Sequence, residues 1–175
     1  MKVTTLIENE WLELKKMVDV EQGVSGYIYS HEKRCEGKIV TILPYRFIDG
    51  KLEYLLRCEV TPCWTMKPVI SSITGGYNGI GIEETVVEEI HEEAGYKVSI
   101  DDLIDLGEMY GTKSSDTVYS LYSVNLTGKK NYEAVGDGSE LEKKAHCFWT
   151  KDLSNVKDPF VFALHYKLTK SIIGK

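Results

Sequence analysis

The sequence predicts an α+β protein in which helices pack on a mixed β-sheet. Two observations support this class. Short apolar runs typical of strands stand on both sides of one helical pattern in the middle of the chain, and a second helical pattern closes the chain. This order differs from the regular strand–helix alternation of a doubly wound parallel fold. We therefore expect a mixed sheet covered by helices.

Composition limits the classes of function. With 175 residues, 42% apolar and 27% charged, the chain fits one soluble globular domain. A formal net charge of −6 argues against binding to a nucleic-acid backbone, which favours a basic surface. No apolar run reaches the roughly 20 residues that span a bilayer, and the N-terminus lacks the apolar core of a signal peptide. The four cysteines form no CxxC pair, so we expect free thiols in a cytoplasmic protein.

The first 36 residues are expected to form a helix followed by an irregular extension. Within residues 6–18 the apolar positions Leu6, Ile7, Trp11, Leu14 and Val18 recur at helical spacing. Residues 22–37 are polar and show no periodicity.

A β-hairpin is predicted next. The apolar runs 38–47 and 51–60 flank Asp49-Gly50, a dipeptide that favours a tight turn between antiparallel strands. A loop over 61–68 leads to a short strand over 69–74, which runs into Gly75 and Gly76.

The remaining elements follow from the same periodicities. The sequence predicts a helix over 82–94 ended by Gly95, and a helix over 158–171 with Asp158 as N-cap and Pro159 at the first helical position. Strands are predicted over 98–109, 117–126 and 145–150, with a polar loop over 131–144.

The helix over 82–94 carries the strongest indication of function. Glu89, Glu92 and Glu93 stand at i, i+3 and i+4, which places them on one helical face. At about 100° per residue, Glu89 and Glu93 border the apolar sector instead of facing away from it. Carboxylates at the edge of a core favour a hard cation such as Mg²⁺, because desolvating them without a partner is costly. The alternative is a solvated, Glu-rich surface helix.

A glycine-rich loop precedes this helix. Gly75 and Gly76 open it, and glycines permit the close backbone approach by which amides meet phosphate oxygens. A flexible turn between strand and helix would show the same composition.

At these residues the chain resembles the Nudix hydrolase family. The family signature is G-x5-E-x7-R-E-U-x-E-E-x-G-U, with U bulky and apolar, and residues 89–96 (EIHEEAGY) match its second half at every position. The order of strands and helices over residues 38–171 also resembles the Nudix α/β/α sandwich. The resemblance implies that Glu89, Glu92 and Glu93 hold Mg²⁺ or Mn²⁺, and that Gly75 or Gly76 is the opening glycine.

The chain departs from the signature at three points. Glu88 stands where the family carries Arg, Ile80 stands where the family carries Glu, and the loop is one residue shorter if Gly75 is the opening glycine, or two if Gly76 is. Glu88 adds a further acid near Glu92 and becomes a candidate metal ligand.

The resemblance also implies a further carboxylate from a late loop, as metal ligand or general base. Glu140 and Glu142 are the first candidates, followed by Glu108 and Asp116. Candidate substrate contacts are Arg57 and Arg46 for phosphate and Trp64 for a base. For each of these the alternative is a structural role, and for Cys63 we expect a buried, inert thiol.

The resemblance implies a metal-dependent pyrophosphohydrolase that cleaves a nucleoside diphosphate linked to another moiety, with a nucleotide sugar or ADP-ribose-like compound as the first candidate. The alternative is a Nudix-fold domain that binds or senses a nucleotide without hydrolysing it. A third option is a structural domain with an acidic helix. The expected partner is a small nucleotide, and we expect no binding to a membrane or to nucleic acid. A homodimer is an alternative to the monomer that the sequence leaves undecided.

Overall fold

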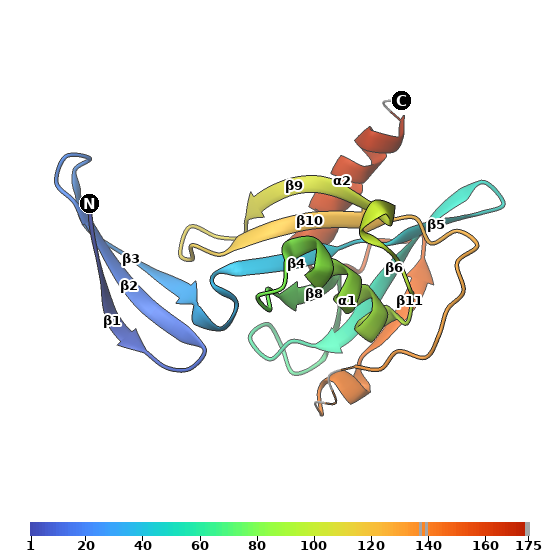
Figure 1. Cartoon of the computed structure of the whole chain (residues 1–175), viewed down its shortest axis with the longest axis horizontal. Helices are drawn as coiled ribbons and strands as arrows, with labels where there is room; N and C mark the ends of the chain where they lie inside the picture. The colour runs from blue at the N-terminus through green and yellow to red at the C-terminus, as the bar shows by residue number, and fades with distance from the viewer. Residues whose placement is uncertain (137, 139, 174–175) are drawn as a thin grey trace.

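The computed structural model of the chain describes residues 1–136, 138 and 140–173 (Figure 1). Its elements are β1 Lys2–Glu8, β2 Leu12–Asp19, β3 Val24–Glu32, η1 Lys33–Cys35, β4 Lys38–Ile42, β5 Tyr45–Ile48, β6 Lys51–Val60, β7 Pro68–Ser71, β8 Ile73–Gly76, α1 Ile82–Ala94, η2 Ile100–Asp102, β9 Leu103–Tyr110, β10 Val118–Val124, η3 Glu142–Lys144, β11 His146–Thr150 and α2 Pro159–Ile173, where η marks a 3-10 helix.

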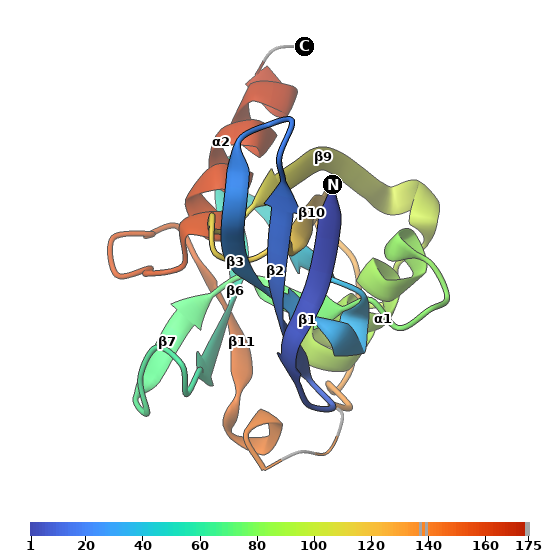
Figure 2. The same cartoon turned by 90° about the vertical axis from the view of Figure 1, so that its left-hand side faces the viewer.

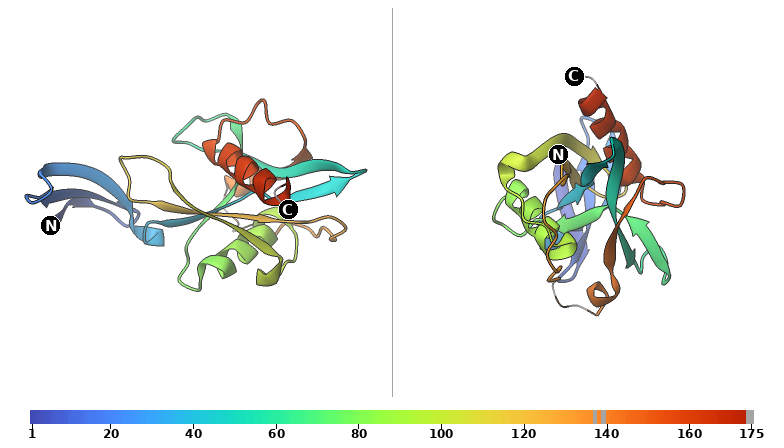
Figure 3. Two further views of the ribbon diagram at one scale, coloured as in Figure 1. Left: turned by 90° about the horizontal axis from the view of Figure 1, so that it is seen from above. Right: turned by 90° about the vertical axis from the view of Figure 1, so that its right-hand side faces the viewer.

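Residues 38–173 form an α/β/α sandwich. Its central sheet has the order β8-β4-β10-β9, in which β4 and β10 run parallel and the other pairs are antiparallel. A second, antiparallel sheet has the order β11-β6-β5, with β7 also paired to β6. Seen from above, α1 and α2 lie on opposite sides of the strands (left panel of Figure 3). The expected α+β class with a mixed sheet is confirmed.

Two strand segments cross from one sheet to the other. The expected strand over 38–47 divides at Leu43-Pro44, so that β4 joins the central sheet and β5 joins the second sheet. Pro44 has no N–H for a ladder, which suits a break at this point. The expected strand over 69–74 likewise divides at Ser72, between β7 and β8. The crossing point at Ser72 is joined to β4 by a hydrogen bond of 2.8 Å between the hydroxyls of Thr41 and Ser72.

The hairpin of β5 and β6 is confirmed. Its strands pair from Tyr45–Tyr54 to Ile48–Lys51, and both turn residues have positive φ, 51° at Asp49 and 71° at Gly50. Positive φ at both positions is typical of the turn that matches the twist of a hairpin.

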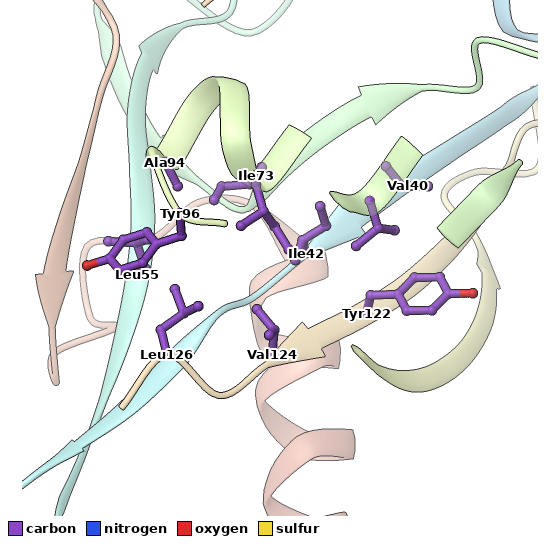
Figure 4. Packing of buried hydrophobic residues seen from close by; sticks show 11 residues of the cluster. Val40, Ile42, Leu55, Ile73, Ala94, Tyr96, Tyr122, Val124 and Leu126 are labelled. Carbon is purple, nitrogen blue, oxygen red and sulfur yellow. The ribbon is translucent and has the colours of Figure 1, made fainter. Parts of the chain in front are cut away.

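The apolar core has two parts. One lies between α1 and the sheets, where Val86 and Ile90 of the helix pack in one cluster with strand residues such as Val40, Ile42 and Ile73. Figure 4 shows these three strand residues. The other lies under α2 and includes residues from β6, β10 and α2, among them Leu56, Leu121, Val161, Leu164 and Leu168. Each helix therefore covers one face with its own apolar stripe.

The expectation of an N-terminal helix over 6–18 is wrong. Residues 2–32 form a three-stranded antiparallel sheet, β1-β2-β3, and the segment expected to be irregular contains β3 and η1. The β1–β2 turn is held by Asn9, whose Oδ1 accepts hydrogen bonds from the backbone N–H groups of Trp11 and Leu12, both at 2.8 Å. Such an Asx turn interrupts the chain where the apolar spacing suggested a continuous helix.

The N-terminal sheet projects away from the sandwich (Figure 1), and its three strands face the viewer in Figure 2. It is joined to the β9–β10 loop by backbone bonds between Ser30 and Ser114 (2.9 Å) and between Asp116 and Ser30 (3.2 Å), and by a bond from His31 to Asp116 (3.0 Å). All seven residues of β1 are exposed, so neither face of this strand is covered by the chain.

The last helix begins where the sequence predicts. Asp158 is 2% exposed, and its Oδ1 accepts a hydrogen bond of 2.8 Å from the backbone N–H of Phe160, as an N-cap does. Its Oδ2 accepts two more, from the backbone N–H (2.9 Å) and hydroxyl (2.6 Å) of Ser72. One carboxylate thus caps α2 and fixes the crossing point between β7 and β8. Among the described residues no helix is long and apolar enough to cross a bilayer.

We expect Asp158→Ala to lower the free energy of unfolding by about 2–3 kcal/mol, because it removes a cap and leaves the buried donors of Ser72 unsatisfied. Urea denaturation measures the change. Asp101→Ala, at an exposed position of η2, is the matched control and should stay within about 0.5 kcal/mol. Equal effects of the two substitutions would contradict this role for Asp158.

Candidate active site

Helix α1 runs from Ile82 to Ala94, as its apolar periodicity predicts. Gly95 ends it with φ of 71°, and the N–H of Tyr96 bonds to the carbonyl of Ile90 at 3.3 Å. This left-handed ending is the usual role of a glycine at a helix C-terminus.

The helix presents its carboxylates in two environments. The side chain of Glu93 is 8% exposed and Glu89 is partly buried, whereas Glu88 and Glu92 are exposed. This difference agrees with the angular placement expected from the sequence, in which Glu89 and Glu93 border the apolar stripe. The four acids therefore do not form one solvated face.

Arg57 of β6 contacts the buried acid. Its Nη1 lies 3.1 Å from Glu93 Oε2, and its Nε donates to Glu59 Oε2 at 2.8 Å. Burial alone would lower the pKa of Arg57, but the charges of Glu93 and Glu59 outweigh it and raise the pKa, so the guanidinium stays charged. Ser71 of β7 donates to the other oxygen of Glu59 at 3.3 Å. The result is a chain of contacts from β7 through β6 to α1.

Gly75 makes room for Glu89. A Cβ placed on Gly75 would come within 1.9 Å of Glu89 Oε1, closer than any real contact. The carboxyl group of Glu89 therefore lies directly on the backbone of β8. Gly76, by contrast, packs against Cys35, where a Cβ would stand 3.1 Å from the Cys35 Cβ.

The loop before α1 is braced by side chains that sequence analysis did not single out. Asn78 donates to Glu88 Oε2 at 2.6 Å and accepts hydrogen bonds from the backbone N–H of Ile80 and the hydroxyl of Thr85, both at 3.2 Å. Glu88 thus contacts the loop, while Ile80 is exposed at 55%. The brace between loop and helix comes from Asn78 and Glu88.

The late loop lies beside the C-terminal end of α1. The N–H of Gly136 bonds to the carbonyl of Glu92 at 3.0 Å, and a cavity of about 250 Å³ is lined by Arg57, Glu92, Glu93, Lys143 and neighbouring loop residues. Glu92 thus stands at the wall of this cavity.

The late-loop carboxylates are placed differently. The side chain of Glu140 is 82% exposed and pairs with Lys143 at 2.6 Å. The side chain of Glu142 lies outside the described part of the structure. Glu108 lines a separate cavity near the start of α1, and Asp116 bonds to His31.

The other candidate substrate contacts lie apart from this face. Arg46 pairs with Glu53 at 2.7 Å and stacks over Trp149 at 4.1 Å from the ring centroid. Both contacts stabilise the β5–β6–β11 sheet. Trp64 lines a larger cavity on the β6–β7 loop.

All four cysteines are free, as expected. The expectation of a buried Cys63 is wrong, because Cys63 is exposed and Cys35 is the buried thiol. Cys147 lies against the candidate site and donates to the carbonyl of Glu93 at 3.4 Å. Burial, followed by the charge of Glu93, raises the pKa of Cys147 to about 12, so this thiol stays protonated near neutral pH.

The donor chemistry of the α1 face fits a hard divalent cation, because it consists of carboxylate oxygens. In the described part of the chain, however, no three His, Cys, Asp or Glu side chains converge on one point. Because Arg57 already contacts Glu93 Oε2, a metal cation would compete with Arg57 for this carboxylate. Loading of this face with a metal would therefore require Glu93 to exchange or share its contact with Arg57.

Sequence analysis missed Glu59, Ser71 and Asn78. Glu59 stands two residues after Arg57 on a predicted strand, so the period of two already places both on one face. The contributions of Ser71 and Asn78 depend on strand pairing and loop conformation, for which the sequence holds no local signal.

The chain was compared with known proteins. No protein-family model matches it, and no curated protein matches it. Solved structures do match: one, described as the crystal structure of an ADP compounds hydrolase, superposes with a TM-score of 0.68 over 99% of this chain and 93% of the other, at 14% identity. At this identity the likeness shows the fold, which is that of the Nudix hydrolases.

We expect Gly75→Ala to destabilise the protein by about 1–3 kcal/mol, because the new methyl group displaces the Glu89 side chain. The double variant Gly75→Ala/Glu89→Ala should recover part of this loss, because it removes the group that clashes. Chemical denaturation of the two single variants and the double variant measures the coupling. Strict additivity would show that Glu89 does not lie against Gly75.

Proposed function

We propose that this chain is a metal-dependent hydrolase of nucleoside diphosphates linked to another moiety, with ADP-linked compounds as the first candidates. The single observation that carries the proposal is the pair formed by Glu89, partly buried against Gly75, and Glu93, nearly buried against Arg57, on one side of α1. The Nudix fold and its likeness to an ADP compounds hydrolase support the reaction class by analogy.

In this proposal Glu89, Glu92 and Glu93 hold Mg²⁺ or Mn²⁺. The bound metal would neutralise the diphosphate and lower the pKa of a water molecule. Glu88 is a weaker candidate ligand, because its carboxylate is bonded to Asn78. Gly75 leaves the space that the Glu89 carboxylate occupies.

The chain's own residues account for positioning and proton transfer. Arg57 orients Glu93, because its Nη1 lies 3.1 Å from Glu93 Oε2. Glu92, which is exposed and lines the 250 Å³ cavity, would take the proton of the attacking water. Glu140 becomes a base only if its loop moves it away from Lys143. One P–O bond to water forms while the bridging P–O bond breaks, leaving two monophosphates.

The second candidate function is a Nudix-fold domain that binds a nucleotide without cleaving it. The ion pair between Arg57 and Glu93 favours it, because a permanent pair would withhold Glu93 from a metal. Purified protein incubated with Mg²⁺ or Mn²⁺ and a panel of nucleotide sugars, dinucleotides and triphosphates separates the two. Release of nucleoside monophosphate supports the hydrolase, whereas tight binding without release supports the binding domain.

We expect Glu93→Gln to lower kcat/KM by about 10²–10⁴-fold, the range for losing a positioned carboxylate. It should also abolish the rise in melting temperature that Mn²⁺ causes by binding the folded state. Glu89→Gln leaves Glu93 itself unchanged and should also lower kcat/KM. It therefore tests the site even if Glu93→Gln fails to fold. Glu83→Gln, in the exposed first turn, is the control. Full activity in both test variants would contradict the site assignment.

We also propose that the chain forms a homodimer through its N-terminal sheet. The molecule exposes 10513 Å², whereas a compact monomer of 19.8 kDa would expose about 8,600 Å². This difference in exposed surface area is larger than the roughly 800 Å² that each partner buries in a standard interface. Exposed apolar residues on the sheet include Ile7 at 70%, Trp11 at 54% and Ile28 at 51%. β1 is also an edge strand, which favours pairing with another chain.

We expect light scattering after gel filtration to show a particle of twice 19.8 kDa. Ile7→Lys should shift this particle toward the monomer, because it places a charge in the apolar contact. Ile48→Lys makes the same change at an exposed isoleucine of the β5–β6 turn and should leave the mass unchanged. A monomer at all concentrations, or an equal effect of the control, would refute the proposal.

The free thiols support a reducing compartment, and we propose a cytoplasmic location.

A further inference from the structure

We propose that a second cavity, connected to the acidic face of α1 by the β6–β7 strand pair, binds the base and one phosphate of the nucleotide substrate; this inference rests on the proposed function. The cavity has a volume of about 670 Å³. It lies between the β6–β7 loop, the β9–β10 loop and the start of α2, and we name it the Trp64 cavity. Its size is within the range of pockets that enclose a small organic ligand.

The Trp64 cavity has an aromatic wall. Tyr119 and Phe160 are stacked with their ring centroids 4.1 Å apart and their planes at 29°. Gly111 lies directly against them, and a Cβ there would come within 2.9 Å of the Tyr119 ring. Across the cavity, Trp64 is 52% exposed, so a large part of its indole is free to stack with a ligand. A flat heteroaromatic ring is the ligand that such a surface favours.

Two lysines add positive charge to the same cavity. Lys67 and Lys157 both line it and are exposed. Within the part of the chain that the structure describes, neither ammonium group lies within 4.0 Å of a carboxylate, unlike Lys33, Lys129 and Lys143. In a protein with a net charge of −6, two such cations beside an aromatic wall point to an anionic ligand. A ring that carries a phosphate, as in a nucleotide, satisfies both features.

The β6–β7 strand pair connects the Trp64 cavity to the acidic face of α1. Val69 lines the cavity and pairs directly with Glu59, so the two side chains share one face of the sheet. Glu59 in turn bonds to Arg57, which contacts Glu93. Trp64 and Lys67 lie on the loop that joins these two strands. A nucleotide with its base at Trp64 would therefore extend along this edge toward Arg57 and the carboxylates of α1.

The test uses adenosine 5′-monophosphate in the presence of EDTA, so that it depends on neither metal nor turnover. We expect this nucleotide to quench tryptophan fluorescence saturably in the wild-type protein. The quench should be absent in Trp64→Phe, while Trp11→Phe, at an exposed tryptophan of the N-terminal sheet, should retain it. Ribose 5-phosphate, which lacks the base, should not quench.

The lysines are tested by Lys67→Ala/Lys157→Ala. We expect this variant to bind adenosine 5′-monophosphate about tenfold more weakly and adenosine unchanged, because only the phosphate contact is lost. Lys51→Ala, at the exposed β5–β6 turn, is the control. In turnover assays Trp64→Ala should raise KM and leave kcat nearly unchanged, since Trp64 contacts no reacting atom.

Persistence of the quench in Trp64→Phe, or equal binding of ribose 5-phosphate and the nucleotide, would overturn the inference. These outcomes are independent of the proposed reaction. A protein that loses turnover in Glu93→Gln but shows no Trp64-dependent quench would keep the proposed function and lose the cavity assignment. A protein without turnover that still shows the quench would keep the cavity and lose the hydrolase.

Discussion

The contact between Arg57 and Glu93 is the interaction on which the candidate site depends. Both side chains are nearly buried, and a buried ion pair is tolerable only when both members keep their partners. Because Glu59 and Ser71 complete the same chain of contacts, the position of α1 relative to β6 and β7 is set by polar bonds as well as by the apolar stripe of the helix. The direction in which Glu89 and Glu93 point follows from that position.

The same contact involves strands that line two cavities. Arg57 and Glu93 line the 250 Å³ cavity, and Val69, opposite Glu59 in the β6–β7 strand pair, lines the Trp64 cavity. β6 and β7 thus each contribute to one of the cavities. In the two proposals above, the diphosphate and its metal would lie beside Glu93, and the base would stack in the Trp64 cavity.

Elements determined by short-range patterns were predictable from sequence. The Asp49-Gly50 turn and the helix from Ile82 to Ala94 are found where the periodicity and turn chemistry place them. The N-terminal sheet was not predictable in this way, because apolar residues at helical spacing also fit strands once Asn9 closes a turn. The division of two strand segments at Pro44 and Ser72 depends on which sheet each half joins, which is a long-range choice.

For the site, the angular position of Glu89 and Glu93 followed from helix geometry, but the partners did not. Arg57, a candidate phosphate contact, is buried between two acids. Glu88, a candidate metal ligand, accepts a hydrogen bond from Asn78 of the loop before the helix. Both outcomes depend on residues that are distant in sequence or on loop conformation.

The parallel pairing of β4 with β10 has a consequence for how the protein is made. β10 is an inner strand of the central sheet, yet it lies about eighty residues after β4, and β8 and α1 are synthesised between them. During synthesis on the ribosome, the edge of β4 that pairs with β10 therefore stays unpaired until residues 118–124 have emerged. α2, the last element, then brings the Asp158 carboxylate that closes the crossing at Ser72. Completion of the fold thus requires residues 118–173 to emerge, and the nascent chain is most exposed to aggregation or chaperone binding before they do.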